Sequence, residues 1–316
     1  MEFITLNRKS FPQYLKEFAD LYTLCFGVEM NDAEVRWRYL ESPYEGLFSC
    51  IAVDRGRLIA NYSASPIALS YHGEPLKAAL SLNTMTHPDY IGKGLFVKLA
   101  SSVYQHLYET GHQMILGFPN NISNRTFVTK LGWKDICEIP TLQLDVKNVK
   151  KRKTAVDFDI IEDNNFLLEY NGLATRDEIA VLKPVEYLRW RFEKHPANRY
   201  YNFAICEKKN GAVSSRIIIK EFRDRINIVD SSFRNEEELY LLINRVIEFA
   251  LEKEKTFVTM WSKLGSWEHI ALEGYGAVLT SPVTYFGANV FGDNVDKEDI
   301  YNANAWRLSM SDDNVY

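Results

Sequence analysis

The sequence predicts an α/β fold built from two related domains. The chain has 316 residues, about the length of two ordinary domains of roughly 150 residues each. Apolar residues alternate in some segments and recur at spacings of three and four in others, so strands and helices follow one another. A tryptophan-arginine-aromatic motif also occurs twice, which indicates two copies of one α/β unit.

The first half of the chain supplies the clearest element signals. Helical spacing is strong from Phe11 to Phe26, and Asn31-Asp32 offers an N-cap for the next helix. Pro140 is expected to interrupt the last strand. We predict strands at 3–6, 47–53, 57–63, 67–71, 76–86, 113–118 and 134–144, and helices at 11–26, 33–40, 94–109 and 123–131.

The second half repeats this order. The segment Trp37-Arg38-Tyr39 with Pro43 recurs 153 positions later as Trp190-Arg191-Phe192 with Pro196, and a strand follows in both cases. Further on, Leu99, Val103 and Gly132 correspond to Leu242, Val246 and Gly274. We therefore predict domains at 1–146 and 156–316, joined by a linker at 147–155 that carries the basic run 150–153. The tail Asp299–Tyr316 is expected to be a frayed acidic terminus.

Composition excludes several classes of protein. The chain is 46% hydrophobic and 25% charged with a formal net charge of −5, which argues against a general nucleic-acid binder. Its four cysteines and six histidines are dispersed, so no metal site is expected. It shows neither a signal-peptide pattern nor an apolar run near the roughly 20 residues of a membrane span, so we expect a cytoplasmic protein without a membrane partner.

The segment from His87 to Phe96 is the strongest functional signal. A strand-like run ends at Thr86, and an amphipathic helix follows Gly94. A glycine-bearing loop at the start of a helix binds anions, because free N–H groups and the positive end of the helix dipole point at it. Gly92 and Gly94 permit close backbone approach, and Lys93 adds a cation. The pattern is neither GxGxxG nor GxxxxGK[ST], which counts against Rossmann and P-loop folds.

This loop, with the strand before it, the helix after it and the later Leu131-Gly132-Trp133, resembles the GNAT superfamily of N-acetyltransferases. The duplication resembles its tandem members, in which one copy is often degenerate. The resemblance implies two domains, each a mixed, mostly antiparallel central sheet flanked by helices. It also implies acetyl-CoA as co-substrate, with its thioester in a splay between two parallel strands. The implied pantetheine contacts are Thr84, Met85 and Thr86, the pyrophosphate loop is Ile91, Gly92, Lys93, Gly94, Leu95 and Phe96, and Asn121 matches the asparagine after the fifth strand.

The chain departs from the family pattern at four positions. Ile91 replaces a Gln or Arg, and Phe96 replaces a small residue, so the helix must leave room for a phenyl ring. Val128 stands where the family often has a tyrosine acid, and Leu82 where it often has a glutamate base. In the second copy, a shift of 143 places Asn235, Glu236 and Glu237 at the loop, and these carboxylates would repel a phosphate. We therefore expect one active copy and one structural copy.

The resemblance implies acyl transfer to an amine. We predict direct transfer in a ternary complex to a primary amine of a small molecule, with an amino sugar preferred and no covalent cysteine intermediate. Candidates for proton handling are Asn83, His87, Glu29 and Tyr62, with Glu34 beside them, although a surface or core role is favoured for each and His87 is expected to be solvated. Two alternatives remain open: a non-catalytic acyl-CoA-binding or sensor protein, and an aminoacyl or longer-acyl transferase of similar tandem fold.

Overall fold

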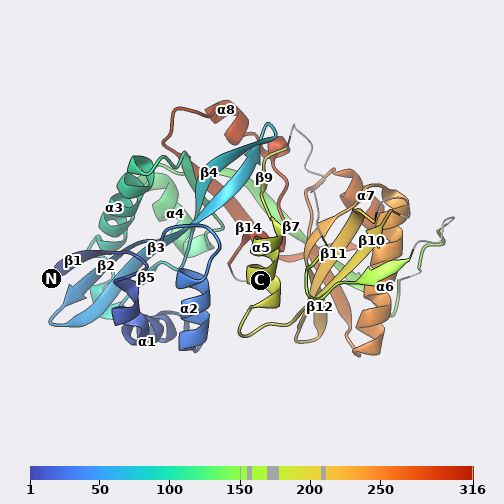
Figure 1. Ribbon diagram of the computed structural model, residues 1–316, viewed down its shortest axis with the longest axis horizontal. Coiled ribbons are helices and arrows are strands. Elements are labelled where there is room, and N and C mark those ends of the chain that lie inside the picture. The colour runs from blue at the N-terminus through green and yellow to red at the C-terminus, as the bar shows by residue number, and fades with distance from the viewer. Residues whose placement is uncertain (150, 155–158, 169–177, 208–210, 315) are drawn as a thin grey trace. The chain divides into compact units, whose positions relative to one another are not determined.

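The computed structural model describes residues 1–149, 151–154, 159–168, 178–207, 211–314 and 316, and the chain forms two compact units (Figure 1). Unit 1 comprises Met1–Cys137, Arg176–Leu182 and Tyr285–Trp306, and unit 2 comprises Glu138–Thr175, Lys183–Thr284 and Arg307–Tyr316. The units interleave along the sequence, whereas the predicted domains were contiguous. Within the predicted linker, residues 150 and 155 lie outside the described part of the chain.

Unit 1 is built on a sheet in the order β1-β2-β3-β4-β6-β14. All its neighbouring strands are antiparallel except β4 and β6, which are parallel. The strands are β1 (Glu2–Leu6), β2 (Phe48–Asp54), β3 (Arg57–Tyr71), β4 (Glu74–Ser81), β5 (Met85–Thr86), β6 (Met114–Gly117) and β9 (Ala180–Val181), while β7 (Lys134–Asp145) and β14 (Val278–Val290) each span both units. The helical elements are η1 (Phe11–Tyr14), α1 (Leu15–Phe26), α2 (Asp32–Leu40), η2 (Pro88–Tyr90), α3 (Leu95–Glu109), α4 (Asn121–Lys130), α8 (Lys297–Ile300) and η4 (Ala303–Ala305).

Both faces of the unit 1 sheet are covered by helices. On one face, α3 and α4 bury a cluster that includes Leu99, Val103 and Phe127. On the other face, η1, α1 and α2 bury a second cluster around Phe18 and Tyr39 (Figure 1). The apolar spacing that predicts these helices therefore corresponds to their buried faces.

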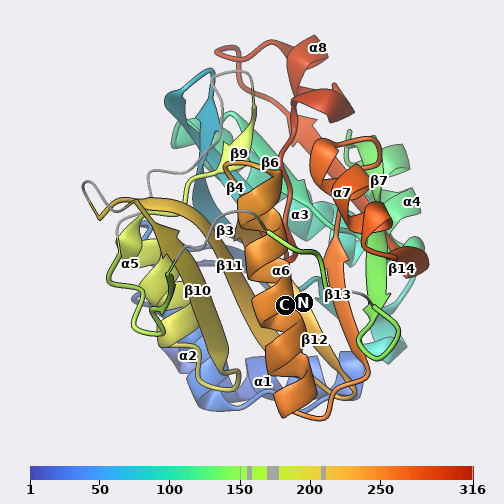
Figure 2. The same cartoon turned by 90° about the vertical axis from the view of Figure 1, so that its right-hand side faces the viewer.

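Unit 2 has the same arrangement, with strands in the order β7-β13-β12-β11-β10-β8 and a parallel pair only at β12 and β13. Helix α6 lies across one face of this sheet (Figure 2) and buries residues such as Leu242 and Val246. The remaining strands are β8 (Ile160–Glu162), β10 (Tyr200–Cys206), β11 (Val213–Phe222), β12 (Arg225–Ser232) and β13 (Phe257–Trp261). The helical elements are α5 (Val185–Leu188), η3 (Arg189–Glu193), α6 (Glu236–Glu252), α7 (Trp267–Gly274) and η5 (Met310–Asp312).

The repeated motif has the same packing role in both units. Tyr39 stacks on Phe11 at 5.0 Å between ring centroids, and Phe192 stacks on Phe166 at 5.4 Å. The strands of unit 2 pair in the same order as those of unit 1. The series β8-β10-β11-β12-β13 repeats the series β1-β2-β3-β4-β6. The last strand is exchanged, because β6 pairs with β14 from late in the chain and β13 pairs with β7 from its first half. The prediction of mixed, mostly antiparallel sheets with flanking helices is confirmed.

Two strands continue through prolines where the sequence predicted breaks. β3 runs through Pro66, which pairs with Ala79 of β4. The pairing of β3 with β2 ends at Ala64, before Pro66 is reached. β7 runs through Pro140, whose carbonyl oxygen accepts the N–H of Ser262 at 3.3 Å. A proline lacks only the donor, so its carbonyl still joins the ladder. Among the described residues, no helix is both long and apolar enough to cross a bilayer.

Candidate functional site

The turn between β5 and α3 has the geometry of an anion-binding loop. Gly92 and Gly94 have φ of +82° and +74°, in the left-handed region that favours glycine. Gly94 is the N-cap residue of α3, and no side chain caps this helix. The N–H groups of its first turn and the positive end of its dipole are therefore directed at whatever lies before Leu95.

This turn is anchored on one side and open on the other. Tyr90 donates a hydrogen bond to Asp54 at 2.7 Å, and Lys93 Nζ lies 4.2 Å from the centroid of the Tyr90 ring. A Cβ atom added to Gly92 or Gly94 would meet nothing within 4 Å, and Ile91 is 69% exposed. Leu95 is buried and fixes the start of the helix to the core. A phosphate group fits such a turn, since its oxygens reach the main chain without meeting a side chain.

Phe96 is accommodated by the core. Its ring stacks on Tyr62 at 5.8 Å between centroids and contacts Phe127 edge-on at 5.1 Å. The phenyl ring thus lies among aromatic side chains under α3, which explains how the helix tolerates it next to the glycine turn.

The parallel pair β4 and β6 lies where the family resemblance implies a splay. Their pairing is recorded for Ala78, Ala79 and Leu80 of β4 against Met114, Ile115 and Leu116 of β6. One residue further on, β4 ends at Ser81 and β6 ends at Gly117. Beyond Ser81, the chain follows β3 instead, with the Leu82 N–H donating to the Ser63 oxygen at 2.9 Å.

The predicted pantetheine segment continues along β3. Met85 and Thr86 form β5, which pairs with Asn61 and Ala60 of β3. Met85 is buried, while Thr84 and Thr86 are half-buried. Asn121 begins α4, and its side chain lies outside what the structure describes.

The candidates for proton handling are not brought together. Glu29 is exposed between α1 and α2, and Glu34 forms the capping box of α2 with Asn31. The Asn83 Oδ1 accepts hydrogen bonds from Arg38 and Tyr39, both at 3.0 Å. These contacts give Glu34 and Asn83 structural roles.

His87 is buried, and the expectation that it is solvated is wrong. Its Nδ1 accepts the N–H of Asp89 at 3.2 Å, so it caps η2, and its ring lies edge-on to Tyr90. A histidine before a proline resembled a loop residue in sequence, but the need for a cap at the short helix holds it inward.

Tyr62 lies in a buried hydroxyl network that sequence reasoning did not identify. Its hydroxyl is 2.9 Å from Ser81 Oγ and 3.0 Å from the hydroxyl of Tyr104, which accepts a hydrogen bond from Trp133 Nε1 at 2.8 Å. Burial raises the pKa of both tyrosines well above the ordinary value. The available signal was the phenol of Tyr104 on the apolar face of a helix, where a buried O–H needs a partner.

The corresponding turn in unit 2 is closed by its own side chains. Asn235 caps α6 by accepting the N–H of Glu238 at 2.9 Å. The buried carboxylate of Glu238 accepts a hydrogen bond from Ser214 at 2.7 Å and another from Ser215. With Glu236 and Glu237 also in the first turn, this helix start is occupied by carboxylates.

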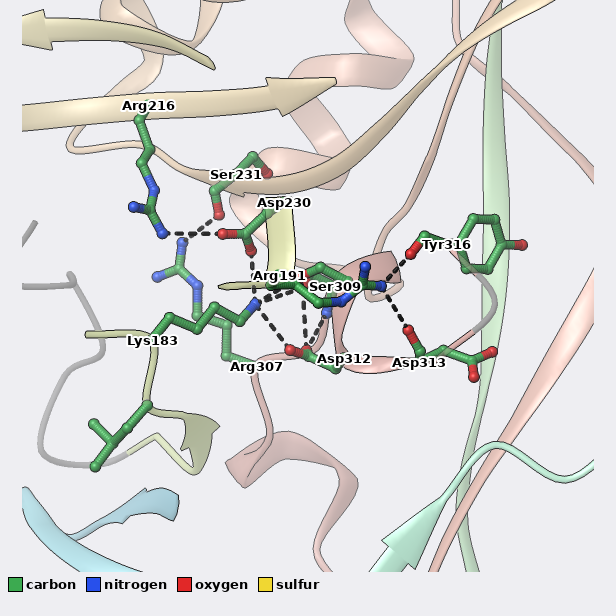
Figure 3. Close-up of polar contacts among 12 residues, drawn as sticks. Lys183, Arg191, Arg216, Asp230, Ser231, Arg307, Ser309, Asp312, Asp313 and Tyr316 are labelled. Carbon is green, nitrogen blue, oxygen red and sulfur yellow. Dashed lines mark hydrogen bonds and ion pairs between the residues drawn. The ribbon is translucent and has the colours of Figure 1, made fainter. Parts of the chain in front are cut away.

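Unit 2 instead holds a buried ionic cluster (Figure 3). Lys183 Nζ lies 2.8 Å from carboxylate oxygens of both Asp230 and Asp312, and Arg216 lies 3.1 Å from Asp230. Arg191 donates to the main-chain oxygens of Asp313 and Tyr316.

The end of the chain is therefore packed, and its interpretation as a frayed acidic terminus is wrong. Asp312 is 5% exposed, because its charge is matched by Lys183, whose side chain is 11% exposed. A capping box formed by Ser309 and Asp312 was the sequence signal for this ordered turn.

Residues 8–136 match the family model of the acetyltransferase (GNAT) domain. A comparison with curated proteins found no match. Among solved structures, the chain is similar to a probable N-acyltransferase from Enterococcus faecalis V583 (TM-score 0.69, 13% identity, 92% of this chain and 72% of that one). It is also similar to a GCN5-related N-acetyltransferase from Anabaena variabilis ATCC 29413 (TM-score 0.68, 12% identity, 91% and 73%). A tandem GNAT protein from the clavulanic acid biosynthesis pathway aligns over 93% of this chain and 99% of its own (TM-score 0.62, 13% identity).

These comparisons agree with the geometry of unit 1. The matched region contains the glycine turn, the uncapped start of α3 and the parallel pair β4 and β6. Residues 8–136 thus match the model of the GNAT acetyltransferase domain, and the chain has the fold of solved GNAT structures.

Proposed function

We propose that unit 1 transfers an acetyl group from acetyl-CoA to a primary amine of a small molecule. The observation that carries this proposal is the pair of positive-φ glycines before an uncapped helix start, a turn that suits the pyrophosphate of CoA. The main-chain groups from Gly92 to Phe96 would hold the pyrophosphate, and Lys93 would add a cation. The segment Thr84–Thr86 would line the pantetheine.

The chemistry follows from a thioester held where β4 and β6 separate. A neutral amine nitrogen attacks the carbonyl carbon, a C–N bond forms, and the C–S bond breaks with its electron pair going to sulfur. The surplus proton of the nitrogen leaves, and the sulfur gains one proton, so charge and atoms balance. Positioning of the two substrates supplies much of the rate. Main-chain N–H groups at the splay would polarise the carbonyl. We propose an amino sugar as the first acceptor class to test.

Calorimetry with acetyl-CoA tests the assignment of the turn. Gly94→Glu places a carboxylate at the helix start, as in unit 2, and forces a side chain into positive φ. We expect it to weaken binding at least tenfold, because like charges repel and the turn is strained. The matched control is Gly111→Glu, which has the same charge and a similar strain (φ +83°, open space) beyond the other end of α3. Equal affinity of Gly94→Glu and wild type would show that the pyrophosphate lies elsewhere.

A second candidate function is acyl-CoA binding without turnover. It is favoured by one observation: Leu82 and Val128 occupy the positions of the usual base and acid, and both are apolar. Release of free CoA thiol with a panel of amines separates the two functions. Amine-dependent release supports the transferase, whereas tight binding without release supports the sensor.

A further inference from the structure

A directional chain of hydrogen bonds runs through the core of unit 1 toward the proposed thioester site. It joins Trp133 Nε1 to the Tyr104 hydroxyl at 2.8 Å, Tyr104 to Tyr62 at 3.0 Å, and Tyr62 to Ser81 Oγ at 2.9 Å. These four side chains come from distant parts of the sequence, and no motif connects them.

The chemistry of the first group sets the direction of the chain. An indole N–H is a donor only, so the Tyr104 oxygen must accept from Trp133. Because the Tyr104 oxygen already accepts from Trp133, we assign its hydroxyl as the donor to Tyr62, and the Tyr62 hydroxyl as the donor to Ser81. Ser81 is left as the end of the chain with a proton still to give, and no further hydrogen bond of its hydroxyl is found among the described residues. Donation along a chain also polarises each following hydroxyl, which makes the last one a better donor.

Ser81 is the last residue of β4, immediately before the chain turns to follow β3. Leu80 and Leu116 are the last recorded pair of β4 and β6, and Ser81 and Gly117 follow immediately. A Cβ atom on Gly117 would come within 3.2 Å of the Ser81 Cβ and 3.3 Å of the Trp133 ring. Glycine at position 117 therefore lets Ser81 and the Trp133 ring pack closely against β6 at the end of the parallel pair.

The chain keeps its protons over a wide pH range. Burial raises the pKa of Tyr62, and burial is also the largest cause that raises the pKa of Tyr104. Both phenols remain neutral donors at the alkaline pH at which an acceptor amine loses its proton.

Unit 2 lacks these features at the matching place. Its last parallel pair is Ile228 with Met260, and the residues that follow are Val229 and Trp261, both buried. A hydroxyl and a glycine in unit 1 thus correspond to an aliphatic side chain and an indole in unit 2. The difference coincides with the loss of the open glycine turn.

We propose that the Ser81 hydroxyl donates a hydrogen bond to the sulfur of acyl-CoA as the C–S bond breaks. Ser81 stabilises the developing thiolate, Tyr62 and Tyr104 position it, and no net proton leaves the protein. The proton that the sulfur finally takes is balanced by the one the amine nitrogen loses. Ser81 would thus supply the donor that a tyrosine often supplies at the position of Val128. This inference rests on the proposed function of unit 1.

Ser81→Ala tests the proposal with two readouts. We expect kcat for amine acetylation to fall roughly 100-fold, the scale for losing a positioned donor, with little change in the KM for acetyl-CoA. The second readout is the thiol pKa of bound CoA, followed by the ultraviolet absorbance of the thiolate. We expect Ser81→Ala to raise it by about one to two units, because a hydrogen bond to a charged group is lost. Tyr62→Phe should shift both quantities in the same direction by less.

Ser102→Ala is the matched control, since Ser102 is an exposed α3 serine whose hydroxyl donates to the Lys98 carbonyl oxygen at 3.2 Å. It should leave both readouts unchanged. If Ser81→Ala keeps the wild-type kcat and the same bound-thiol pKa while wild type binds and turns over acetyl-CoA, the role of Ser81 is overturned and the proposed function stands. If wild type binds no CoA, the proposed function is overturned, and this inference with it.

Discussion

Lys220 is a buried cation without an acidic partner among the described residues. It lies on β11 and is 5% exposed. Its Nζ is 5.9 Å from the ring centroids of Tyr200 and Tyr316, and its cross-strand neighbour on β12 is the neutral Asn227. The charged group that acts on it is Arg191, which repels it. Replacing this lysine with methionine keeps the volume and removes the charge.

The size and sign of the effect follow from the pKa of Lys220. Burial, and then Arg191, lower it from 10.5 to about 8. Below pH 8 the lysine is charged in both the folded and unfolded states, so the folded state carries the whole penalty of about 3 kcal/mol, at 1.36 kcal/mol per pKa unit. Between pH 8 and 10.5 the folded protein has already released the proton, and the penalty declines to zero. Lys220→Met should therefore stabilise the protein by up to about 3 kcal/mol at pH 7.

Urea unfolding at a series of pH values measures this difference. The gain of Lys220→Met over wild type should be largest at neutral pH and should shrink as the pH rises toward 10. Lys253→Met removes a lysine near the C-terminal end of α6 whose side chain is 42% exposed, and it should change stability by less than about 0.5 kcal/mol at every pH. A destabilised Lys220→Met, or a gain that is the same at pH 7 and pH 10, would refute the reasoning.

Three further predictions concern the folded framework. Gly287→Ala should cost about 1–3 kcal/mol in thermal or urea unfolding, because its Cβ would lie 2.9 Å from the Lys134 carbonyl oxygen. Asp312→Asn should cost about 3 kcal/mol, because the buried Lys183 loses one of its two carboxylates, and an unchanged melting temperature would contradict the pairing. Burial raises the pKa of Asp230, but Lys183 and Arg216 outweigh it and hold the pKa below its usual range. The stability that this lowered pKa provides is fully present above the ordinary aspartate pKa and is lost as the pH falls through the lowered value. Asp230→Asn should therefore make the free energy of unfolding depend less on pH in the acid range.

Local signals in the sequence predicted local structure well. Asn31 was proposed as an N-cap and forms a capping box with Glu34, and the glycines of the anion loop have the positive φ that their positions suggested. Each of these features depends on a few neighbouring residues. Backbone conformation and capping are therefore readable from a single segment.

Long-range partners were not readable in the same way. Nothing in the sequence of β14 shows that it pairs with β6 of unit 1. The same limit applies to Asp312. The sequence shows it only as one of several acidic residues near the end of the chain, and only the fold brings Lys183 beside it. Tyr104 and Trp133 lie 29 residues apart, and only the fold brings their polar atoms together. Burial of a polar group is set by such partners, so sequence alone could not identify the core networks.

The two units show how one topology can differ in chemistry through a few positions. The buried residues Leu99 and Val103 of α3 correspond to Leu242 and Val246 of α6. When the two helices are aligned on these residues, α6 begins two residues earlier than α3. Glycines placed at 236 and 237 alone would therefore not create an anion site in unit 2. Asn235 would still cap the helix, and the buried Glu238 would still hold a negative charge in its first turn. Trp261 would still stand at the position that Gly117 has in unit 1.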